Sequence, residues 1–229
     1  MTDTKGKVVA VNGNMVSVEF DGNISMNEVG YVKVEGSDLK SEVIRIRGNT
    51  AQMQVYEMTK GIKAGDPVEF TGDLLSAELG PGLLGQVYDG LQNPLPLLAE
   101  KAGWFLERGV YVPPLDTEKK WEFTPTAKVG DVVHRGEYVG TVPEGPFTHK
   151  IFVPFYLLGN YKVKSVVAKG EYTIHDTIAV ITDEKGKDVN VTMAFRWPVK
   201  RAVDCYAERL APDETMVTKV RLIDTFFPV

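Results

Sequence analysis

The sequence is poor in the residues that mark several common classes of protein. Cys205 is its only cysteine, so no disulfide can form within the chain, and this scarcity is typical of a reducing compartment. The first residues, MTDTKGK, lack the apolar segment of a signal peptide. No apolar run approaches the ~18 residues that a membrane-spanning helix requires. These absences predict a soluble, intracellular protein.

Positive charge is not in excess either. The chain has 26 Lys and Arg against 31 Asp and Glu, a formal net charge of −5. A surface for nucleic acid or for an anionic membrane needs a basic excess, so the balance argues against both partners. Apolar residues make up 43% of the 229 residues, which is enough for one large core or two smaller ones.

Patterns that carry catalytic or metal chemistry are also scarce. His134, His149 and His175 are the only histidines, and they lack the short spacings of a metal site. No G-x-S-x-G nucleophile elbow occurs, and no motif around Cys205 marks it as a nucleophile. Each of these residues is interpreted as structural or as a surface residue.

Two pairs of acidic residues are candidates for a general acid and a general base. Glu118 with Glu122, and Asp183 with Glu184, have the surroundings of solvated turns. The two carboxylates of a glycosidase can lie far apart in sequence, so a dispersed hydrolase site stays open as an alternative, although no pattern favours it. We therefore predict no catalytic, cofactor-binding or metal-binding residue in this chain.

One segment imitates a phosphate-binding loop. The stretch GPGLLGQV, residues 80–87, has the glycine spacing G-x-x-x-x-G, but Gln86 and Val87 stand where Lys and Ser or Thr are needed. The missing lysine would carry charge to the terminal phosphates and the missing hydroxyl would hold magnesium. We interpret Gly80-Pro81-Gly82 as an interdomain turn that uses the permissive backbone angles of glycine.

The first seventy residues have the alternation of β-strands. Val16, Val18 and Phe20 alternate with polar residues, and Asn12-Gly13 just before them is a hairpin signal. Similar alternation recurs around 44–55, and further turn signals stand at 21–22, 35–36, 48–49 and 64–66. Short strands at this spacing predict a small closed barrel or a sandwich. Closure is favoured because it removes exposed strand edges.

A single clear helix is predicted near residues 95–106. Asn93 is the expected N-cap, prolines stand at the helix start, and Gly109 is placed to end it. The apolar stripe of helical period consists of Leu95, Leu98, Ala99, Ala102, Phe105 and Leu106.

Strand patterns return from Tyr111 to about Val191. Trp121 and Phe123 alternate with Glu122, which predicts a strand with one buried face. The turn at residues 183–186 predicts a hairpin between flanking apolar runs. KVGDVVHRGEYVGTV (128–142) echoes KAGDPVEF (63–70), and shared turn chemistry explains the echo better than duplication.

The same stretch, 128–142, resembles the turn region of lipoyl and biotinyl carrier domains. Those domains present a modifiable lysine at an exposed hairpin tip, flanked by Asp or Met. Lys150 and Lys164 lack that setting. A free-standing carrier or binding module is kept as the alternative function.

Linear motifs spread over the whole chain resemble the N-terminal part of the catalytic A subunit of V-type and A-type rotary ATPases, in a bacterial form. Eight matching stretches in the same order make the resemblance specific. They are QVYEMTKG (54–61), GDPVEFTGDLLSAELGPGLL (65–84), YDGLQNPL (88–95), RGVYVPPLD (108–116), KKWEFTP (119–125), GEYTIHDTIAVI (170–181), RWPVK (196–200) and IDTFFPV (223–229).

The chain departs from the family pattern at three places. The family usually has Gln-Arg-Pro-Leu where Asn93 stands and Trp-Pro-Val-Arg where Lys200 stands. It usually has Thr-Gly-Gln-Arg where this chain has Thr-Lys-Val-Arg at 218–221, next to the nucleotide domain. None of these positions is catalytic in the family.

The resemblance implies a mainly β protein with four segments. Residues 1–72 would form the N-terminal β barrel, and residues 73–110 would begin an α/β nucleotide-binding domain that contains the helix. Residues 111–190 would form the β-rich bulge inserted in A subunits, and residues 191–229 would return to the nucleotide-binding domain.

The resemblance also implies where the chemistry lies. The family's phosphate loop, which binds ATP or ADP and Mg²⁺, follows the IDTFFP motif and would lie beyond Val229, so this part would be inactive alone. The whole protein would couple ATP hydrolysis or synthesis to proton or sodium transport, on the cytoplasmic face of a membrane that it meets only indirectly.

Protein partners follow from the same resemblance. The barrel would contact B subunits in the hexameric head, the bulge would contact the peripheral stalk, and the whole protein would also meet the central stalk. RLIDTFFPV (221–229) has the pattern of a buried strand, and the resemblance places it just before the phosphate loop. Phe226 and Phe227 would pack against the rest of the whole protein, and in this chain alone they would be either exposed or buried by rearrangement or by a neighbouring copy.

Overall fold

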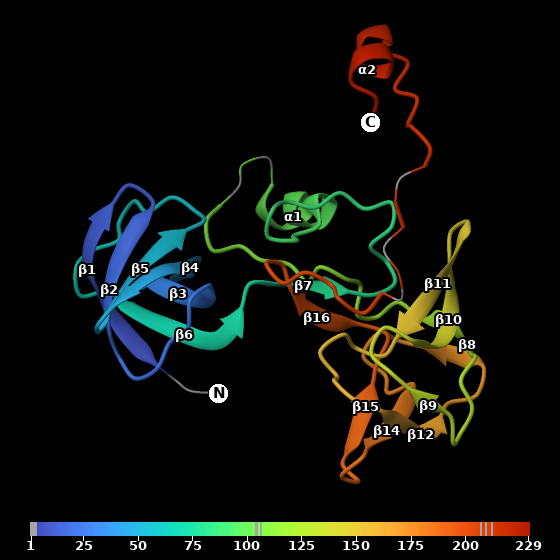
Figure 1. The fold of residues 1–229 in the computed structure, drawn as a ribbon. Helices are drawn as coiled ribbons and strands as arrows, with labels where there is room; N and C mark the ends of the chain where they lie inside the picture. Colours follow the sequence, from blue (N-terminus) through green and yellow to red (C-terminus); the bar gives the residue numbers. More distant parts are fainter. Residues whose placement is uncertain (1–3, 104, 106, 207, 209, 212) are drawn as a thin grey trace.

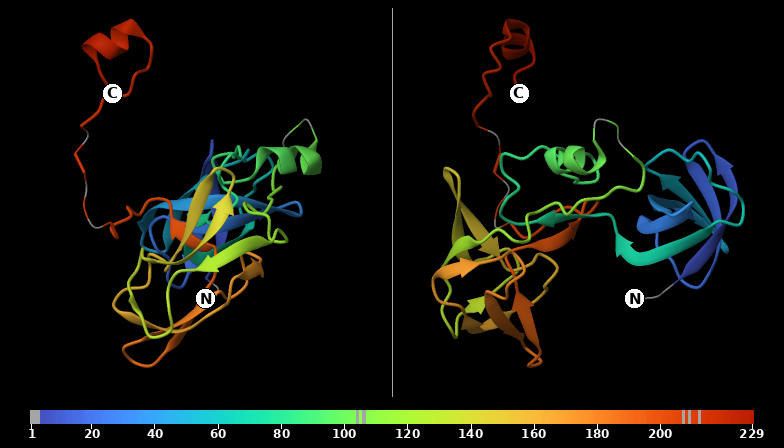
Figure 2. Two further views of the ribbon diagram at one scale, coloured as in Figure 1. Left: turned by 90° about the vertical axis from the view of Figure 1, so that its right-hand side faces the viewer. Right: turned by 180° about the vertical axis from the view of Figure 1, so that it is seen from behind.

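The computed structural model describes residues 4–103, 105, 107–206, 208, 210–211 and 213–229. Figure 1 shows a β barrel at one side, a second β-rich unit at the other, and a connecting region with helix α1 (Leu95–Ala102) between them. The carboxyl-terminal helix α2 (Arg221–Phe226) stands apart from both units in this view and in the two views of Figure 2. The prediction of a mainly β protein with a small barrel is confirmed.

The barrel closes with six strands in the order β1-β2-β5-β4-β3-β6. Alternating valines point inward, and Val16, Val18 and Val32 are fully buried. The strands are β1 (Lys5–Asn12), β2 (Met15–Asp21), β3 (Glu28–Val34), β4 (Ser37–Arg47), β5 (Thr50–Val55) and β6 (Pro67–Leu74). Closure pairs both edges of every strand, which is the physical reason that it was favoured over a sandwich.

The predicted turn residues make the barrel hairpins. Glu35 and Gly36 both have positive φ, 49° and 83°, between the paired strands β3 and β4. Two consecutive residues in this region are the mark of a type I′ turn. Gly13 and Gly48 likewise have positive φ, in the β1–β2 and β4–β5 connections. These turns set the register that buries one face of each strand.

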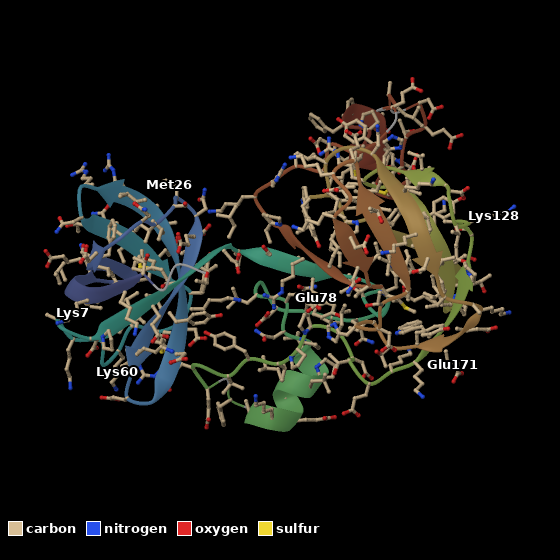
Figure 3. The ribbon with its side chains drawn as sticks, turned by 90° about the horizontal axis from the view of Figure 1, so that it is seen from below. Lys7, Met26, Lys60, Glu78, Lys128 and Glu171 are labelled. Atoms are coloured by element: carbon tan, nitrogen blue, oxygen red, sulfur yellow. The ribbon has the colours of Figure 1, made fainter. Side chains whose placement is uncertain are left out.

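A two-stranded ribbon links the two β-rich units. Strand β7 (Ser76–Leu79) leaves the barrel, and β16 (Phe195–Pro198) pairs with it antiparallel on the chain's return. Figure 3 looks at the molecule from below, with Glu78 labelled on the strand that runs between the two units. The ribbon therefore places one outgoing and one returning segment side by side between the two units.

Helix α1 (Leu95–Ala102) is shorter than predicted and begins differently. Pro94 is the N-cap, without a side-chain hydrogen bond, so the expectation that Asn93 caps the helix is wrong. The helix ends at Gly103, with φ 74°, and not at Gly109. Within the described part of the helix only Leu98 is buried, and Leu106, predicted on the same stripe, lies outside the described residues.

The second β-rich unit consists of two four-stranded sheets, ordered β11-β10-β8-β13 and β15-β14-β12-β9. Trp121 and Phe123 are buried on β8, as the alternation predicts, and β14 and β15 form the predicted hairpin. The strands are β8 (Trp121–Pro125), β9 (Val132–Val133), β10 (Tyr138–Glu144), β11 (Phe147–Phe152), β12 (Tyr161–Val166), β13 (Gly170–Tyr172), β14 (Ala179–Asp183) and β15 (Asp188–Val191).

The core of this unit also takes residues from outside the predicted span of 111–190. Met193 and Ala194 are buried members of its cluster, and Leu83 packs against it. Gly80 is buried, and a Cβ there would lie 2.8 Å from Ala194 Cβ. The segment that carries Gly80 therefore packs on the second unit, while its role as an interdomain turn stays a prediction.

The carboxyl-terminal segment is helical, so the strand expected from its pattern is wrong, and of the alternatives for its two phenylalanines the structure has the exposed one. Helix α2 (Arg221–Phe226) has no buried residue. Phe226 and Phe227 are 69% and 72% exposed. Asp224 accepts hydrogen bonds from the backbone N–H and hydroxyl of Thr218, which lower its pKa from the usual value. These local bonds close a turn, which an apolar pattern does not reveal.

Side chains from the connecting region hold the barrel in place. The Tyr111 hydroxyl donates to Glu57 Oε1 at 2.7 Å and accepts from the backbone N–H of Lys40 at 3.0 Å. Burial and the Glu57 carboxylate raise the pKa of Tyr111 well above its usual value. Across the molecule, Lys200 Nζ lies 2.7 Å from Glu42 Oε1, whose side chain is 4% exposed. The barrel is thus tied to the connecting region through Tyr111 and to the segment after β16 through Lys200.

Candidate functional site

The glycine-rich segment that imitates a phosphate loop does bind an anion, and the anion belongs to the chain itself. The backbone N–H groups of Gly82 and Leu84 donate to Glu144 Oε1 at 2.6 and 3.2 Å. Glu144 stands at the end of β10 and is 6% exposed. Glycine permits this close approach, since Gly82 has φ +107°.

His149 completes the site from the neighbouring strand β11. Its Nδ1 lies 2.6 Å from Glu144 Oε2, and its side chain is 22% exposed. The two oxygens of Glu144 are therefore both used, one by the loop amides and one by the imidazole. We call Gly82, Leu84, Glu144 and His149 the carboxylate clamp. Because the backbone N–H groups of this loop already donate to Glu144, the loop is held against strand β10 of the second unit.

The histidines do not assemble into a metal centre among the residues that the structure describes. No group of three or more His, Cys, Asp and Glu residues there could hold a metal ion. His134 Nδ1 lies 3.4 Å from Glu137 Oε2 on the surface. His175 is exposed. The three histidines thus lie in separate places, and among them only His149 has a buried carboxylate partner.

Cys205 is a half-buried thiol that packs against a turn. A Cβ added at Gly136 would lie 2.8 Å from its Sγ, and Gly136 has φ +80°. Arg135, next to this turn, pairs with Asp204 at 2.9 Å. These contacts fit the packing interpretation of the thiol, which remains a prediction.

The acidic pairs serve local structure. Asp183 Oδ1 accepts from the backbone N–H groups of Lys185 and Lys187 at 2.9 and 2.8 Å, which closes the β14–β15 turn. Glu184 accepts from the side chain of Asn160 at 3.1 Å. In the other pair, Glu122 lies 2.8 Å from Lys169 Nζ. Both pairs lie on exposed turns and strand faces.

The two lysines of the carrier alternative lie in the wrong places for modification. Lys150 lies within β11, with Nζ 4.9 Å from the centroid of the Tyr138 ring. Lys164 lies within β12 and pairs with Asp188. The tip between β10 and β11 consists of Gly145 and Pro146. Neither lysine is at a hairpin tip, so the geometry does not favour a carrier domain.

The structure also brings together charged side chains that no sequence motif indicates. Glu144 had no signal, because its amide partners lie 60 and 62 residues away in sequence. Lys40, Arg196 and Arg201 come together with Tyr31 and Trp197 around one cleft. Their separation along the chain concealed this grouping, which only the topology of the barrel and ribbon brings about.

None of the helices in the described parts of the chain has the length and apolar character required to cross a membrane.

Comparison with known proteins finds matches to both β-rich units. The family model described as "ATP synthase alpha/beta family, beta-barrel domain" matches residues 8–72. The model described as "ATPsynthase alpha/beta subunit barrel-sandwich domain" matches residues 112–200. The first match covers the strands of the closed barrel and the second covers both four-stranded sheets.

Curated relatives match the chain from end to end. A V-type ATP synthase alpha chain of Treponema denticola is 66% identical over 229 residues, which are 100% of this chain and 39% of that protein. V-type ATP synthase alpha chain 1 of Treponema pallidum is 62% identical over the same lengths. A V-type ATP synthase alpha chain of Borreliella burgdorferi is 58% identical over 227 residues, 40% of its length. The chain thus spans about two fifths of these relatives.

Proposed function

From its similarity to V-type ATP synthase alpha chains and to two ATP synthase alpha/beta domain models, we propose that this chain belongs to that family and supplies the assembly part of a rotary ATPase subunit. In the whole protein, ATP hydrolysis or synthesis would be coupled to the movement of protons or sodium ions. The complex would lie on the cytoplasmic face of the membrane. ATP or ADP and Mg²⁺ would bind through residues that this chain does not contain.

Each unit has a role in this proposal. The barrel, residues 1–72, contacts B subunits in the hexameric head, and the bulge, residues 111–190, contacts the peripheral stalk. Residues 73–110 and 191–229 belong to the nucleotide-binding domain. The observation that carries the proposal is the pair of family matches on two separately cored units. These matches support this reading and not the lipoyl or biotinyl alternative.

The first prediction is that the isolated chain neither hydrolyses ATP nor binds it tightly in the presence of magnesium. Its glycine-rich loop lacks the lysine and hydroxyl of a phosphate loop, and its amides already bind Glu144. Calorimetric titration with Mg-ATP and a phosphate-release assay measure both quantities. Tight, magnesium-dependent ATP binding would contradict the proposed division of roles.

The second prediction concerns the barrel contact. Because a closed barrel has no free edge, subunits must meet through its outward side chains. Val9 and Val11 on β1 are apolar and 45% and 38% exposed. We expect V9E and V11E each to weaken association with purified B subunits by about tenfold, since charge at an apolar contact costs about 1 kcal/mol or more.

Native mass spectrometry or sedimentation with B subunits checks this expectation. The matched control is V132E, which places the same charge at a valine of the second unit that is 59% exposed. Equal losses in all three variants would refute a contact through the barrel, and unchanged affinity in V9E and V11E would refute this face of it.

A further inference from the structure

A cleft of about 420 Å³ lies where the barrel meets the β7–β16 ribbon. It is lined by residues of β3 and β4, of the end of β6 and the start of β7, and of β16 with the residues after it. Its lining includes the aromatic and cationic side chains of Tyr31, Lys40, Tyr156, Arg196, Trp197 and Arg201. We call it the junction cleft.

The junction cleft is positively charged. Lys40, Arg196 and Arg201 line it, and Asp73 is the only carboxylate among its lining residues. Within the described part of the chain, none of the three cations has a carboxylate oxygen within 4.0 Å. Glu78 is the cross-strand neighbour of Arg196 and is not among these pairs. Among the described residues, three cations thus share one concave site with a single lining carboxylate, Asp73, and none of the three is in a direct ion pair.

The pKa of Lys40 is lowered from its usual value, which reflects its burial and its repulsion from a neighbouring cation. Burial lowers the pKa of Lys40, and the charge of Arg196 lowers it further, against a smaller opposite effect from Asp89. Lys40 Nζ lies 5.7 Å from the centroid of the Tyr111 ring, which offers only a weak cation–π partner. A bound anion would relieve the repulsion between the cations.

The two arginines can present their planar donors to such an anion. The guanidinium of Arg201 lies 5.0 Å from the centroid of the Trp197 ring. Trp197 Nε1 donates to the carbonyl oxygen of Arg201 at 2.8 Å, which fixes the backbone at that position. Arg196 is exposed on β16 and is held by the ribbon register. Guanidinium groups are suited to bidentate binding of phosphate.

We propose that the junction cleft binds the phosphate group of a small molecule, with Lys40, Arg196 and Arg201 as its donors. Two sources share this chemistry, a free inorganic phosphate or pyrophosphate and a nucleoside phosphate. The cleft is larger than one phosphate group, and the rings of Tyr31 and Tyr156 offer surfaces on which a base could stack. This site goes beyond the proposed function and uses none of its catalytic chemistry.

The test is calorimetric titration of the 229-residue chain with pyrophosphate and with AMP, in EDTA and at constant ionic strength. We expect saturable binding of at least one of them. R196Q and R201Q should each weaken it about tenfold, because each removes charged hydrogen bonds to the anion. K40Q should weaken it as well. Thermal melting verifies that each variant is folded.

The matched control is R47Q, on the same strand as Lys40 but outside the cleft and exposed. Tighter binding of AMP than of pyrophosphate supports the nucleotide source, and the reverse order supports free phosphate. Absence of saturable binding for both ligands, or an equal loss in R47Q, overturns the site. Because magnesium is absent, this result is independent of the Mg-ATP titration that tests the proposed function.

Discussion

Replacing Phe123 with alanine is expected to lower the free energy of unfolding of the second β-rich unit by about 3–5 kcal/mol. The side chain is 0% exposed and belongs to the core shared by the two sheets. Its ring meets Tyr172 edge to face, with centroids 6.3 Å apart. A Cβ at Gly140 would lie only 2.2 Å from the Phe123 ring, so the ring fills the space above that glycine. Its loss leaves a cavity.

The effect should be confined to the second unit. The barrel core and the core that contains Phe123 have no residue in common. Trp121 lies in the core of the second unit and Trp197 lies on β16, both outside the barrel strands, so their fluorescence reports on the second unit and the ribbon. In urea, the F123A fluorescence transition should move to lower concentration while hydrogen exchange of barrel amides stays protected.

M53A is the matched core variant of the barrel, since Met53 is also 0% exposed. It should reverse the pattern and release the barrel amides first. V132A, at an exposed valine, should change little. If both probes shifted together in F123A and in M53A, the two units would unfold as one and the proposal of separate units would be wrong.

The barrel could be predicted from sequence because its determinants are local. Inward valines at period two fix the buried face, and residues such as Glu35 and Gly36 fix the hairpin turn at the required backbone angles. Each signal lies within a few residues of the structure that it determines. The same reasoning gave the strand of Trp121 and Phe123 and the hairpin at 183–186.

The predictions at the helix failed where a distant partner competes for a local signal. Asn93 can cap a helix, but its Nδ2 donates to Asp89 Oδ2 at 2.8 Å and its Oδ1 accepts from the backbone N–H of Val112 at 3.1 Å. The side chain is buried and used for this cross-link. The 19-residue separation from Val112 has no trace in the sequence pattern.

The sites were hidden for the same reason. The glycine spacing at 80–85 predicts only a turn, and only the fold shows that amides of this segment bind Glu144. Similarly, Lys40 and Arg196 are 156 positions apart in the numbering and meet only because the ribbon returns beside the barrel. Local patterns predict elements, and non-local topology decides which charges meet.

The carboxylate clamp gives the second large effect. We expect E144A to lower the free energy of unfolding of the second unit by about 3 kcal/mol or more, because it leaves the N–H groups of Gly82 and Leu84 without their acceptor in a partly buried site. His149 loses its partner as well. Urea denaturation measures the loss, and amide exchange at Gly82 and Leu84 should rise sharply.

Two conservative variants separate the contributions of the clamp. E144Q keeps an oxygen that can accept from both amides, so its loss should be about 1 kcal/mol and the exchange at Gly82 should stay slow. H149Q removes the imidazole and leaves the amide contacts, so it should resemble E144Q. If E144Q were as harmful as E144A, the charge and the imidazole pair would dominate over the amides. If the Gly82 amide were equally protected in E144A, the carboxylate would not hold the loop, and packing of Gly80 against Ala194 would have to hold it instead.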